Sequence, residues 1–404
     1  MQQQNKAQKK MNTPLLLMAL TVLIDFTGFG LLFPLLPFWA LRLGASPFMI
    51  GVISAAFTVA QVIGIPILGA LSDKYGRKPV ILVSLLIEVI SLILSALANS
   101  IPLLLLARCI GGLGASNIAS AQAVAADTTS EENRAASMGM IGAAIGVGFV
   151  LGPIIGGSLT VVSLAAPFWA AAGIALINAI LVWRFLPETR FLHATSNTAA
   201  KQKFNGSLIK NTTILQLVSV NFIYTLAFSG METIFALFIK WQFHWGTIQA
   251  GWIFTFIGVI VVIVQGGLIR QLTQRFKLGS ILISGLLLLG IGLFVIPLGN
   301  SVGAMFVGLG LLSIGDGLVT PVISSMISAA GSKDTQGSLL GAAQSAASVG
   351  RIAGPLIATV LFSAIGVGAP FYAGAIIVAI AAADAFYFVK ITPAYKISSE
   401  VASA

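Results

Sequence analysis

Long apolar runs, separated by short polar turns, dominate the hydrophobic pattern of the chain. Each run is close to or above the length of about 20 residues that a helix needs to cross the hydrocarbon core of a bilayer. The pattern predicts an all-α membrane protein with twelve transmembrane helices. The runs cover approximately residues 13–41, 47–70, 79–99, 102–123, 136–161, 165–186, 213–239, 247–269, 280–299, 302–326, 338–362 and 368–389.

The composition excludes a water-soluble fold. Of the 404 residues, 57% are hydrophobic and 8% are charged, and the mean hydropathy is +1.00. An ordinary soluble domain carries about 25% charged residues. Residues 1–12 are polar and basic, and the apolar run after them is longer than the core of a signal peptide, so we expect this run to stay as the first span.

The net charge of +10 is distributed as in a membrane protein. When the N-terminus is placed in the cytoplasm, most Lys and Arg residues outside the spans fall on the inner side, and Arg42 and Lys240 face out. This asymmetry follows the positive-inside rule. It predicts a multi-pass protein of the cell membrane with both termini in the cytoplasm, and it gives no reason to expect a nucleic-acid partner.

Residue types that build metal centres and enzyme active sites are scarce. The single cysteine, Cys109, lies in an apolar run, and the two histidines, His193 and His244, fall in predicted loops. A structural disulfide, a metal site, a bound cofactor and an intramembrane nucleophile with its base are therefore not expected. The predicted partners are a small-molecule substrate, protons and lipid, and the protein is expected to be a monomer.

One long polar segment, residues 187–212, divides the runs into two sets of six. We interpret it as a cytoplasmic linker between an N-terminal six-helix bundle, residues 1–186, and a C-terminal one, residues 213–404. Two sequence matches, at an offset of about 202 residues, indicate that the halves arose by duplication. Gly148-Phe-Val-Leu-Gly-Pro153 aligns with Gly350-Arg-Ile-Ala-Gly-Pro355, and Ala166-Pro-Phe-Trp-Ala170 with Ala369-Pro-Phe-Tyr-Ala373. Such parallel repeats place substrate between the halves, near the middle of the membrane.

Four motifs resemble those of the major facilitator superfamily. Gly69-Ala-Leu-Ser-Asp-Lys-Tyr-Gly-Arg-Lys-Pro79, between spans two and three, is similar to the loop signature of the whole family. The glycines and proline of span five, and Arg108 followed by Gly111, Gly112 and Gly114 in span four, resemble motifs of its drug:proton antiporters. Span one, from Asp25 to Pro37, resembles the twelve-helix members, in particular the tetracycline exporters. The resemblance covers the whole chain and implies two pseudo-symmetric six-helix bundles.

The loop signature implies a gate on the cytoplasmic side. We expect its aspartate to cap or pair across helix ends, and its basic residues to bind carboxylates or carbonyl groups when that face is closed. The second half has Thr273 at the place of this aspartate, so the gating charge is predicted in the N-terminal half. The predicted gating residues are Gly69, Asp73, Gly76, Arg77, Lys78, Asp127 and Arg134.

Charged groups inside spans are costly and are functional candidates. Asp25 and Arg108 are both predicted in the middle to outer part of the membrane, where they can meet, and alternate pairing with Arg108 would let Asp25 hold and release a proton. A fixed, purely structural ion pair is the alternative. A second candidate cluster for proton coupling or substrate contains Glu232, Asp316 and Arg351, again with a structural pair as the alternative. Glu88 and Asp384 are weaker candidates.

Two further sets of residues complete the expected machinery. Glycines in span five permit close helix contact and Pro153 bends the helix, so these residues are expected to serve conformational change or packing. This set contains Gly139, Gly148, Gly152, Pro153, Gly156 and Gly157 of span five, with Gly354 and Pro355 at the equivalent places of span eleven. In-span amides, which need polar partners, are expected in the substrate cavity. They are Gln61, Asn117, Gln122, Asn221, Gln265 and Gln344.

The leading interpretation is a proton-driven antiporter that exports small lipophilic or amphipathic compounds, with the proton gradient as its energy source. The direction comes from the resemblance alone. The alternative is a carrier of narrow specificity for a sugar, amino acid, siderophore or lipid-linked solute, possibly working as an importer. Span nine has no carboxylate and span eight no histidine, a departure from the tetracycline exporters that favours this alternative and speaks against tetracycline as substrate.

Overall fold

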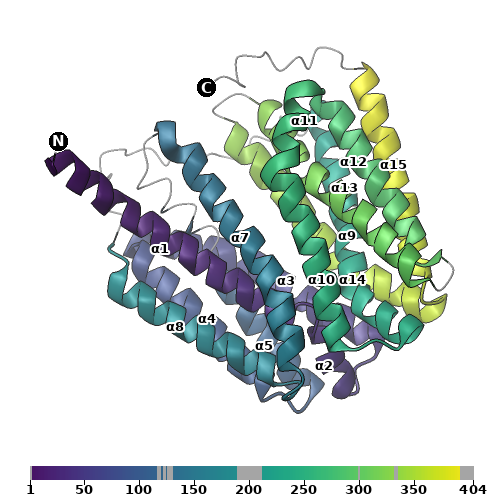
Figure 1. The fold of residues 1–404 in the computed structure, drawn as a ribbon, viewed down its shortest axis with the longest axis horizontal. Helices are drawn as coiled ribbons and strands as arrows, with labels where there is room; N and C mark the ends of the chain where they lie inside the picture. The colour runs from purple at the N-terminus through teal and green to yellow at the C-terminus, as the bar shows by residue number, and fades with distance from the viewer. Residues whose placement is uncertain are drawn as a thin grey trace. The chain divides into compact units, whose positions relative to one another are not determined.

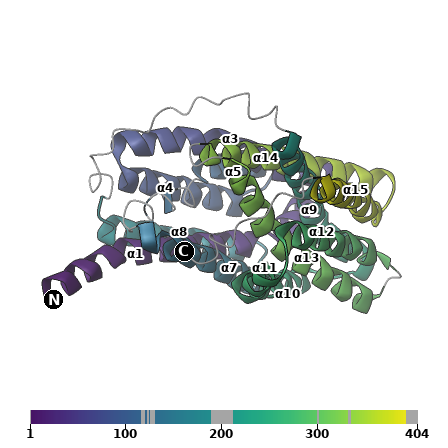
Figure 2. The same ribbon diagram turned by 90° about the horizontal axis from the view of Figure 1, so that it is seen from above.

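The computed structural model describes residues 2–115, 120–121, 124, 131–188, 212–298, 301–331 and 335–391; within these ranges, the side chains of 2–14, 131–136 and 388–391 are not described. Every regular element in these ranges is a helix, as Figures 1 and 2 show. The predicted all-α membrane fold is therefore confirmed.

The helices follow the predicted apolar runs closely. Those before the predicted linker are α1 (Gln2–Leu32), α2 (Leu36–Arg42), α3 (Pro47–Tyr75), α4 (Arg77–Ala96), α5 (Ile101–Gly114), α7 (Glu131–Leu159) and α8 (Ala166–Phe185). Those after it are α9 (Thr212–Phe243), α10 (Thr247–Ile263), the π-helical turn η3 (Val264–Leu268), α11 (Ile269–Arg275), α12 (Leu278–Val295), α13 (Val302–Ala329), α14 (Gln336–Ala364) and α15 (Ala369–Ile391).

Eleven helical stretches of the described part are long and apolar enough to cross a membrane. α5 is apolar but has 14 residues, and the predicted span 102–123 continues past its end into residues that lie mostly outside the described part. Many large apolar side chains on these helices are exposed, among them Trp183, Ile357 and Ile376. In water such a surface would be unfavourable, whereas in a bilayer it contacts lipid.

The first predicted span, 13–41, is not one helix. α1 ends at Leu32, residues 33–35 form a turn, and α2 starts at Leu36. Pro34 explains the break, because proline has no N–H and disfavours the helical conformation of the residue before it. Pro37 fits the first turn of α2, where no hydrogen-bonded N–H is needed. Trp39 then fixes α2 by donating its indole N–H to the carbonyl of Ser95, at 3.1 Å.

Contacts within the chain define two compact units. The first contains Met1–Ala200 with His244–Gly258, and the second contains Lys201–Phe243 with Val259–Ala404. The first part of α10 therefore belongs to the first unit, where it packs on α7. The side chains of Thr160 and Thr247 share a hydrogen bond of 2.7 Å, and Thr255 donates to the carbonyl of Val150 at 3.2 Å.

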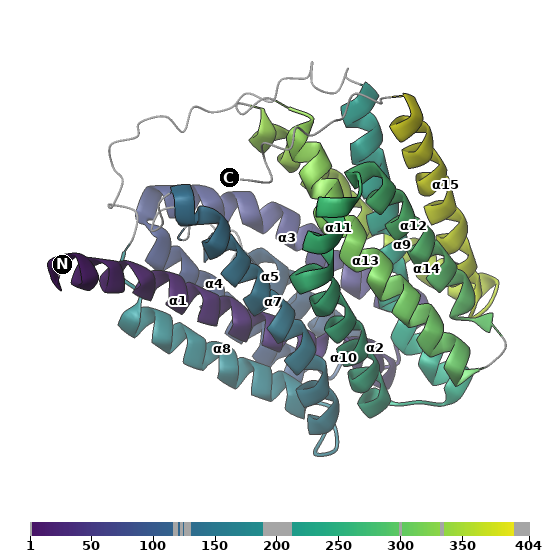
Figure 3. The same cartoon turned by 45° about the horizontal axis from the view of Figure 1, so that its top comes forward.

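In the first unit, α1 packs between α7 and α8, and α4 packs on α5 and α8. Figures 1 and 3 show α1 and α8 side by side. The apolar core of this unit is formed mainly by side chains of α1, α4, α7 and α8. It contains Leu15, Met18, Val22, Ile81, Leu85, Ala121, Val124, Ile141, Ala179, Val182 and Leu186.

The second unit repeats these helix pairs. α9 packs on α14 as α1 packs on α7, and α12 packs on α15 as α4 packs on α8. Figure 3 shows α12 running alongside α15. Glycines of α12 and α13 bring these two helices close together, since a Cβ atom at Gly292 would lie 2.6 Å from the carbonyl oxygen of Gly308. The repeated pairing agrees with the duplication indicated by the sequence.

Candidate functional site

A partly buried polar contact joins Asp25 of α1 to Asn178 of α8. The side-chain Nδ2 of Asn178 donates to Oδ1 of Asp25 at 3.0 Å and to the carbonyl oxygen of Thr21 at 3.4 Å. Asn178 is 1% exposed, and its neighbours on the buried face of α8, Ala175 and Val182, are apolar. The sequence interpretation missed Asn178, because an uncharged amide in an apolar run gives only a weak signal.

Glu88 of α4 is the second carboxyl group of this region. It interacts electrostatically with Asp25 and is half-buried. Like charges in a low dielectric repel strongly, so a proton bound by either group lowers the energy of the pair. Glu88, a weaker candidate than Asp25 from the sequence, therefore belongs to the same electrostatic environment as Asp25.

Arg108 of α5 does not pair with Asp25, although both residues lie in the described part. Its guanidinium lies over the ring of Phe57 on α3, with 4.2 Å from Cζ to the ring centroid. Its Nε is buried without a hydrogen-bond partner among the described residues. The predicted exchange of partners between Asp25 and Arg108 remains a prediction, and this structure shows the separated arrangement.

The second predicted cluster is brought together in the second unit. Asp316 of α13 is 9% exposed and accepts a hydrogen bond at Oδ1 from the hydroxyl of Tyr224 on α9. That hydroxyl also shares a hydrogen bond of 3.0 Å with Oγ1 of Thr320. The ring of Tyr224 stacks on Phe228, with 5.9 Å between centroids. Tyr224 was missed from the sequence because tyrosine is common in spans and carries no charge.

Glu232 and Arg351 complete this cluster. Glu232 of α9 interacts electrostatically with both Asp316 and Arg351, and Arg351 of α14 also interacts with Tyr224. The Nη2 of Arg351 donates to Oγ of Ser348 at 3.2 Å. The cluster thus holds two carboxyl groups and one guanidinium.

The two halves differ at the position after the first repeated glycine. In the first half this residue is Phe149 of α7, whose ring lies 5.3 Å from that of Phe26 and 5.8 Å from that of Phe29. In the second half it is Arg351, among Tyr224 and Glu232. An aromatic contact between the first paired helices is therefore replaced by a charged one between the second pair.

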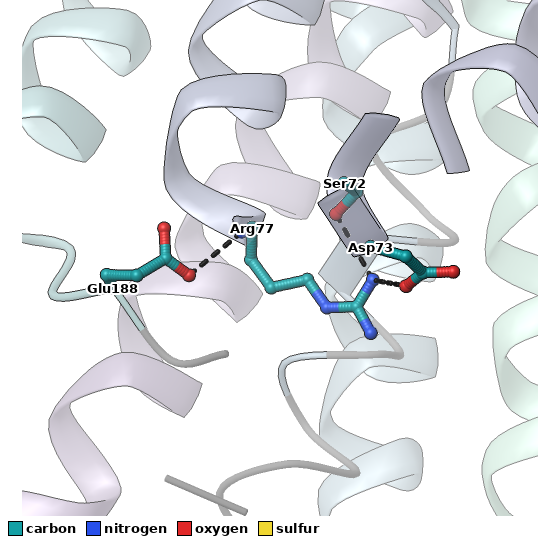
Figure 4. A network of polar contacts seen from close by, with 4 residues as sticks. All are labelled: Ser72, Asp73, Arg77 and Glu188. Atoms are coloured by element: carbon teal, nitrogen blue, oxygen red, sulfur yellow. Dashed lines mark hydrogen bonds and ion pairs between the residues drawn. The ribbon is translucent and has the colours of Figure 1, made fainter. Parts of the chain in front are cut away.

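The loop signature forms a compact polar network (Figure 4). Gly76 has φ +109°, a conformation that glycine adopts readily, and separates α3 from α4. The Nη1 of Arg77 lies 2.9 Å from Oδ1 of Asp73 and 3.1 Å from Oγ of Ser72. Asp73 lies in the last turn of α3 and Arg77 begins α4, so this ion pair bridges the glycine turn between the two helices.

Glu188 ties the end of α8 to this network, and it was not identified from the sequence. Its carboxylate accepts hydrogen bonds from the backbone N–H of Arg77, at 2.9 Å, and of Lys78, at 3.2 Å. Both N–H groups lie in the first turn of α4. A carboxylate at this position satisfies free N–H groups and interacts favourably with the helix dipole.

The repeated glycine motif places two helix pairs in backbone contact. A Cβ atom at Gly152 of α7 would lie 2.7 Å from Cα of Gly30 on α1, and one at Gly354 of α14 would lie 2.9 Å from the backbone N of Gly230 on α9. Equivalent glycines therefore perform the same packing in each half. Gly139, by contrast, has no atom within 4 Å of such a Cβ. Whether the motif also serves conformational change stays a prediction.

The amides predicted to line a cavity have different surroundings in the structure. Asn221 donates to the carbonyl of Ala343 at 3.0 Å and so connects α9 with α14. Gln61 is half-buried, whereas Gln265 and Gln344 are exposed on their helices. Two groups of predictions fall outside what the structure describes: Asn117, Gln122 and Asp127 as whole residues, and Arg134 for its side chain.

Comparisons with known proteins agree with this architecture. The family model described as Major Facilitator Superfamily matches residues 18–279 and 217–403. The chain is 30% identical over 365 residues to the class C tetracycline resistance protein of Escherichia coli, covering 88% of this chain and 91% of that protein. It is 29% identical over 334 residues to major facilitator superfamily domain-containing protein 10 of Homo sapiens, covering 77% and 72%.

A solved structure shares the fold over nearly the whole chain. The crystal structure of the human organic anion transporter MFSD10 (TETRAN) matches with a TM-score of 0.68 and 26% sequence identity, covering 93% of this chain and 99% of that one. The resemblance predicted from the motifs is thus confirmed. The chain belongs to the Major Facilitator Superfamily, whose members are membrane transporters of small molecules and not enzymes.

Proposed function

We propose that this transporter is a proton-coupled antiporter that exports small lipophilic or amphipathic compounds. The observation that carries the proposal is a hydrogen-bonded carboxyl group inside the spans of each unit, Asp25 with Asn178 and Asp316 with Tyr224. A second carboxyl group, Glu88 or Glu232, interacts electrostatically with each of them. Ionisable groups are expensive within a membrane and mark proton or ion pathways. The similarity to a tetracycline resistance protein supports export as the direction.

In this mechanism, protonation and substrate binding bias the inward-facing and outward-facing states differently. A ligand shifts a conformational equilibrium only through its different affinity for the two states. Neutralising Asp25 removes a partly buried charge where α1 contacts α8. At a membrane potential of 100 mV, each elementary charge moved across the membrane contributes about 2.3 kcal/mol to driving transport.

The loop signature is proposed to act on the same equilibrium from one end of the helices. The Asp73–Arg77 pair and the Glu188 contacts hold the α3–α4 turn and the end of α8 together. The positive-inside pattern supports a cytoplasmic location for this turn and for both termini in the cell membrane. The protein is proposed to function as a monomer.

Substrate-induced proton release in proteoliposomes tests the proposal. Purified protein is reconstituted, a pH gradient is imposed, and lipophilic cations and neutral drugs are added one at a time while the internal pH is recorded. The wild type is expected to release protons with at least one compound, and Asp25→Asn is expected to abolish this release. Asp384→Asn, which removes a carboxylate from α15, is the matched control and is expected to retain release.

Either of two results would overturn a part of the proposal. Silence of the wild type across the panel contradicts a drug:proton antiporter and favours a carrier of narrow specificity. Full proton release by Asp25→Asn assigns the coupling proton to the Asp316 and Glu232 cluster instead.

A second candidate function, transport of organic anions, is favoured by the position of Arg108. Its guanidinium lies over Phe57 and makes no ion pair with a described carboxylate, so it is available for an anionic group. The human relative whose structure matches is itself described as an organic anion transporter. Uptake of a labelled aromatic carboxylate into the same vesicles distinguishes the two functions, since Arg108→Gln should abolish anion transport and Asp25→Asn should spare it.

A further inference from the structure

Asn178 is a buried polar residue whose presence packing alone does not explain. It lies near the middle of α8, on a face that is otherwise apolar, and is 1% exposed. An amide buried among apolar side chains is unfavourable unless its donors and its acceptor find partners. An amide at this position therefore calls for a role beyond filling space.

The side chain of Asn178 donates hydrogen bonds but accepts none among the described residues. Both recorded bonds use the Nδ2 group, which donates to Oδ1 of Asp25 and to the carbonyl of Thr21. The acceptor Oδ1 of Asn178 is buried without a hydrogen-bond partner among the described residues. An ionised carboxylate can only accept hydrogen bonds. It can therefore accept from Nδ2 of Asn178, but it cannot donate a hydrogen bond to Oδ1 of Asn178.

We propose that Asn178 is the positioning residue of Asp25, and that its amide serves both protonation states of that carboxyl group. When Asp25 is ionised, Nδ2–H donates to it, as the structure shows. When Asp25 takes up a proton from water, its O–H donates to Oδ1 of Asn178 after the amide turns by half a rotation about its Cβ–Cγ bond. The proton remains bound to Asp25 while its O–H donates to Asn178, and it goes back to water when Asp25 ionises again. No covalent bond of Asn178 changes.

This inference rests on the proposed function, in which Asp25 carries the coupling proton. The charged group that acts on Asp25 from α4 is Glu88. Residues 137–159 of α7 contain no charged side chain, and the charged residue of α8, Arg184, is exposed near the end of that helix. Arg108 on α5 makes no ion pair with Asp25 in the described part. Asn178 is thus an uncharged hydrogen-bond partner that can respond to a change in charge at Asp25.

Infrared difference spectroscopy tests the inference on the full-length protein in lipid. Spectra at acid and alkaline pH are subtracted, which isolates groups that change on protonation. In the wild type we expect a protonated-carboxyl band that is lost in Asp25→Asn, accompanied by a side-chain amide band that shifts when asparagine is isotopically labelled. In Asn178→Leu, which keeps the size but removes the amide, the amide change should vanish. The carboxyl band should move to higher frequency, since the acid has lost its acceptor.

Control variants keep the test independent of folding. Asn178→Ala is measured in parallel, so that the test proceeds if the leucine variant fails to give a monodisperse peak on size exclusion. Ser95→Ala removes another buried side-chain hydrogen bond, from Oγ of Ser95 to the carbonyl of Ser91 in the same unit, and should leave the carboxyl band unchanged.

The outcomes separate the inference from the function on which it rests. If the wild type shows a carboxyl band that depends on Asp25 but neither Asn178 variant moves it, the role of Asn178 is refuted and the proton site stands. If no carboxyl band depends on Asp25, the assignment of the coupling proton to Asp25 is itself wrong, and the inference fails with it.

Discussion

The hydroxyl of Tyr224 on α9 donates a hydrogen bond to Oδ1 of Asp316 on α13, across 92 residues of sequence. Thr320, one turn after Asp316, lies 3.0 Å from the same hydroxyl. Tyr224 therefore links α9 to α13 through the carboxylate of Asp316 and the hydroxyl of Thr320. Glu232 and Arg351 act on this pair through their charges.

Replacing Tyr224 by phenylalanine keeps the ring and its stacking on Phe228 but removes the hydrogen bond to Asp316. An interhelical side-chain hydrogen bond in a membrane contributes about 1 kcal/mol, so we expect a small loss of thermal stability. We expect a larger loss of transport, since Asp316 is no longer fixed. Thermal denaturation followed by size exclusion, and transport in vesicles, measure the two effects.

Tyr372→Phe is the matched control for this change. Tyr372 on α15 packs edge-on against Phe294, with 5.5 Å between ring centroids, and neither residue belongs to the charged cluster. Its hydroxyl should be dispensable for transport. Equal losses in the two variants would show that the hydroxyl of Tyr224 has no special role.

Alanine at Gly152 or Gly354 is expected to destabilise the protein. The new methyl group would lie less than 3 Å from the backbone of the neighbouring helix, at Gly30 or Gly230, and the helices would have to separate. Overpacking of this kind costs about 1–3 kcal/mol. The expected result is a lower midpoint of thermal denaturation for each variant.

Two glycines on the same helices serve as controls. A Cβ atom at Gly142 of α7 or Gly341 of α14 would meet no atom within 4 Å. Alanine favours a helix over glycine by about 1 kcal/mol, so these variants should be neutral or slightly more stable. Destabilisation equal to that of the Gly152 and Gly354 variants would refute the close-contact explanation.

Asp73→Asn separates stability from function in the loop signature. The side chain of Asp73 is 70% exposed and that of Arg77 is 20% exposed, and exposed ion pairs contribute about 0–1 kcal/mol. We therefore expect almost unchanged thermal stability. If the signature acts as a gate, transport should nevertheless fall several-fold. Unchanged transport in vesicles would argue against a gating role for this aspartate.

Glu188→Ala is expected to loosen the start of α4. The change removes the acceptor of the N–H groups of Arg77 and Lys78, and losing a cap at a helix N-terminus costs about 0.5–2 kcal/mol. Thermal denaturation should detect the loss. Amide hydrogen exchange should rise in the first turn of α4 and stay the same at α12, which is in the other unit. Uniform exchange changes in both helices would contradict a local capping role.

The sequence by itself determined the spans, the family and the repeated glycine motif. These features depend on local composition, because a helix needs a certain apolar length to cross a bilayer and its backbone bonds are made within the segment. The predicted span 13–41 is instead broken at Pro34, because proline lacks the N–H that a continuous helix needs. The Asp73–Arg77 pair is likewise local, since the two residues are four apart in the sequence, on either side of the turn at Gly76.

Only the tertiary structure decided which buried groups meet. Asn178 contacts Asp25, Tyr224 contacts Asp316, and Glu188 reaches the first turn of α4, across separations of 153, 92 and 111 residues. Arg108 lies against Phe57 instead of Asp25. A span's sequence fixes the faces of its helix, but the rotation of that helix against its neighbours depends on packing over its whole length. Uncharged partners such as asparagine and tyrosine gain their meaning only from that packing.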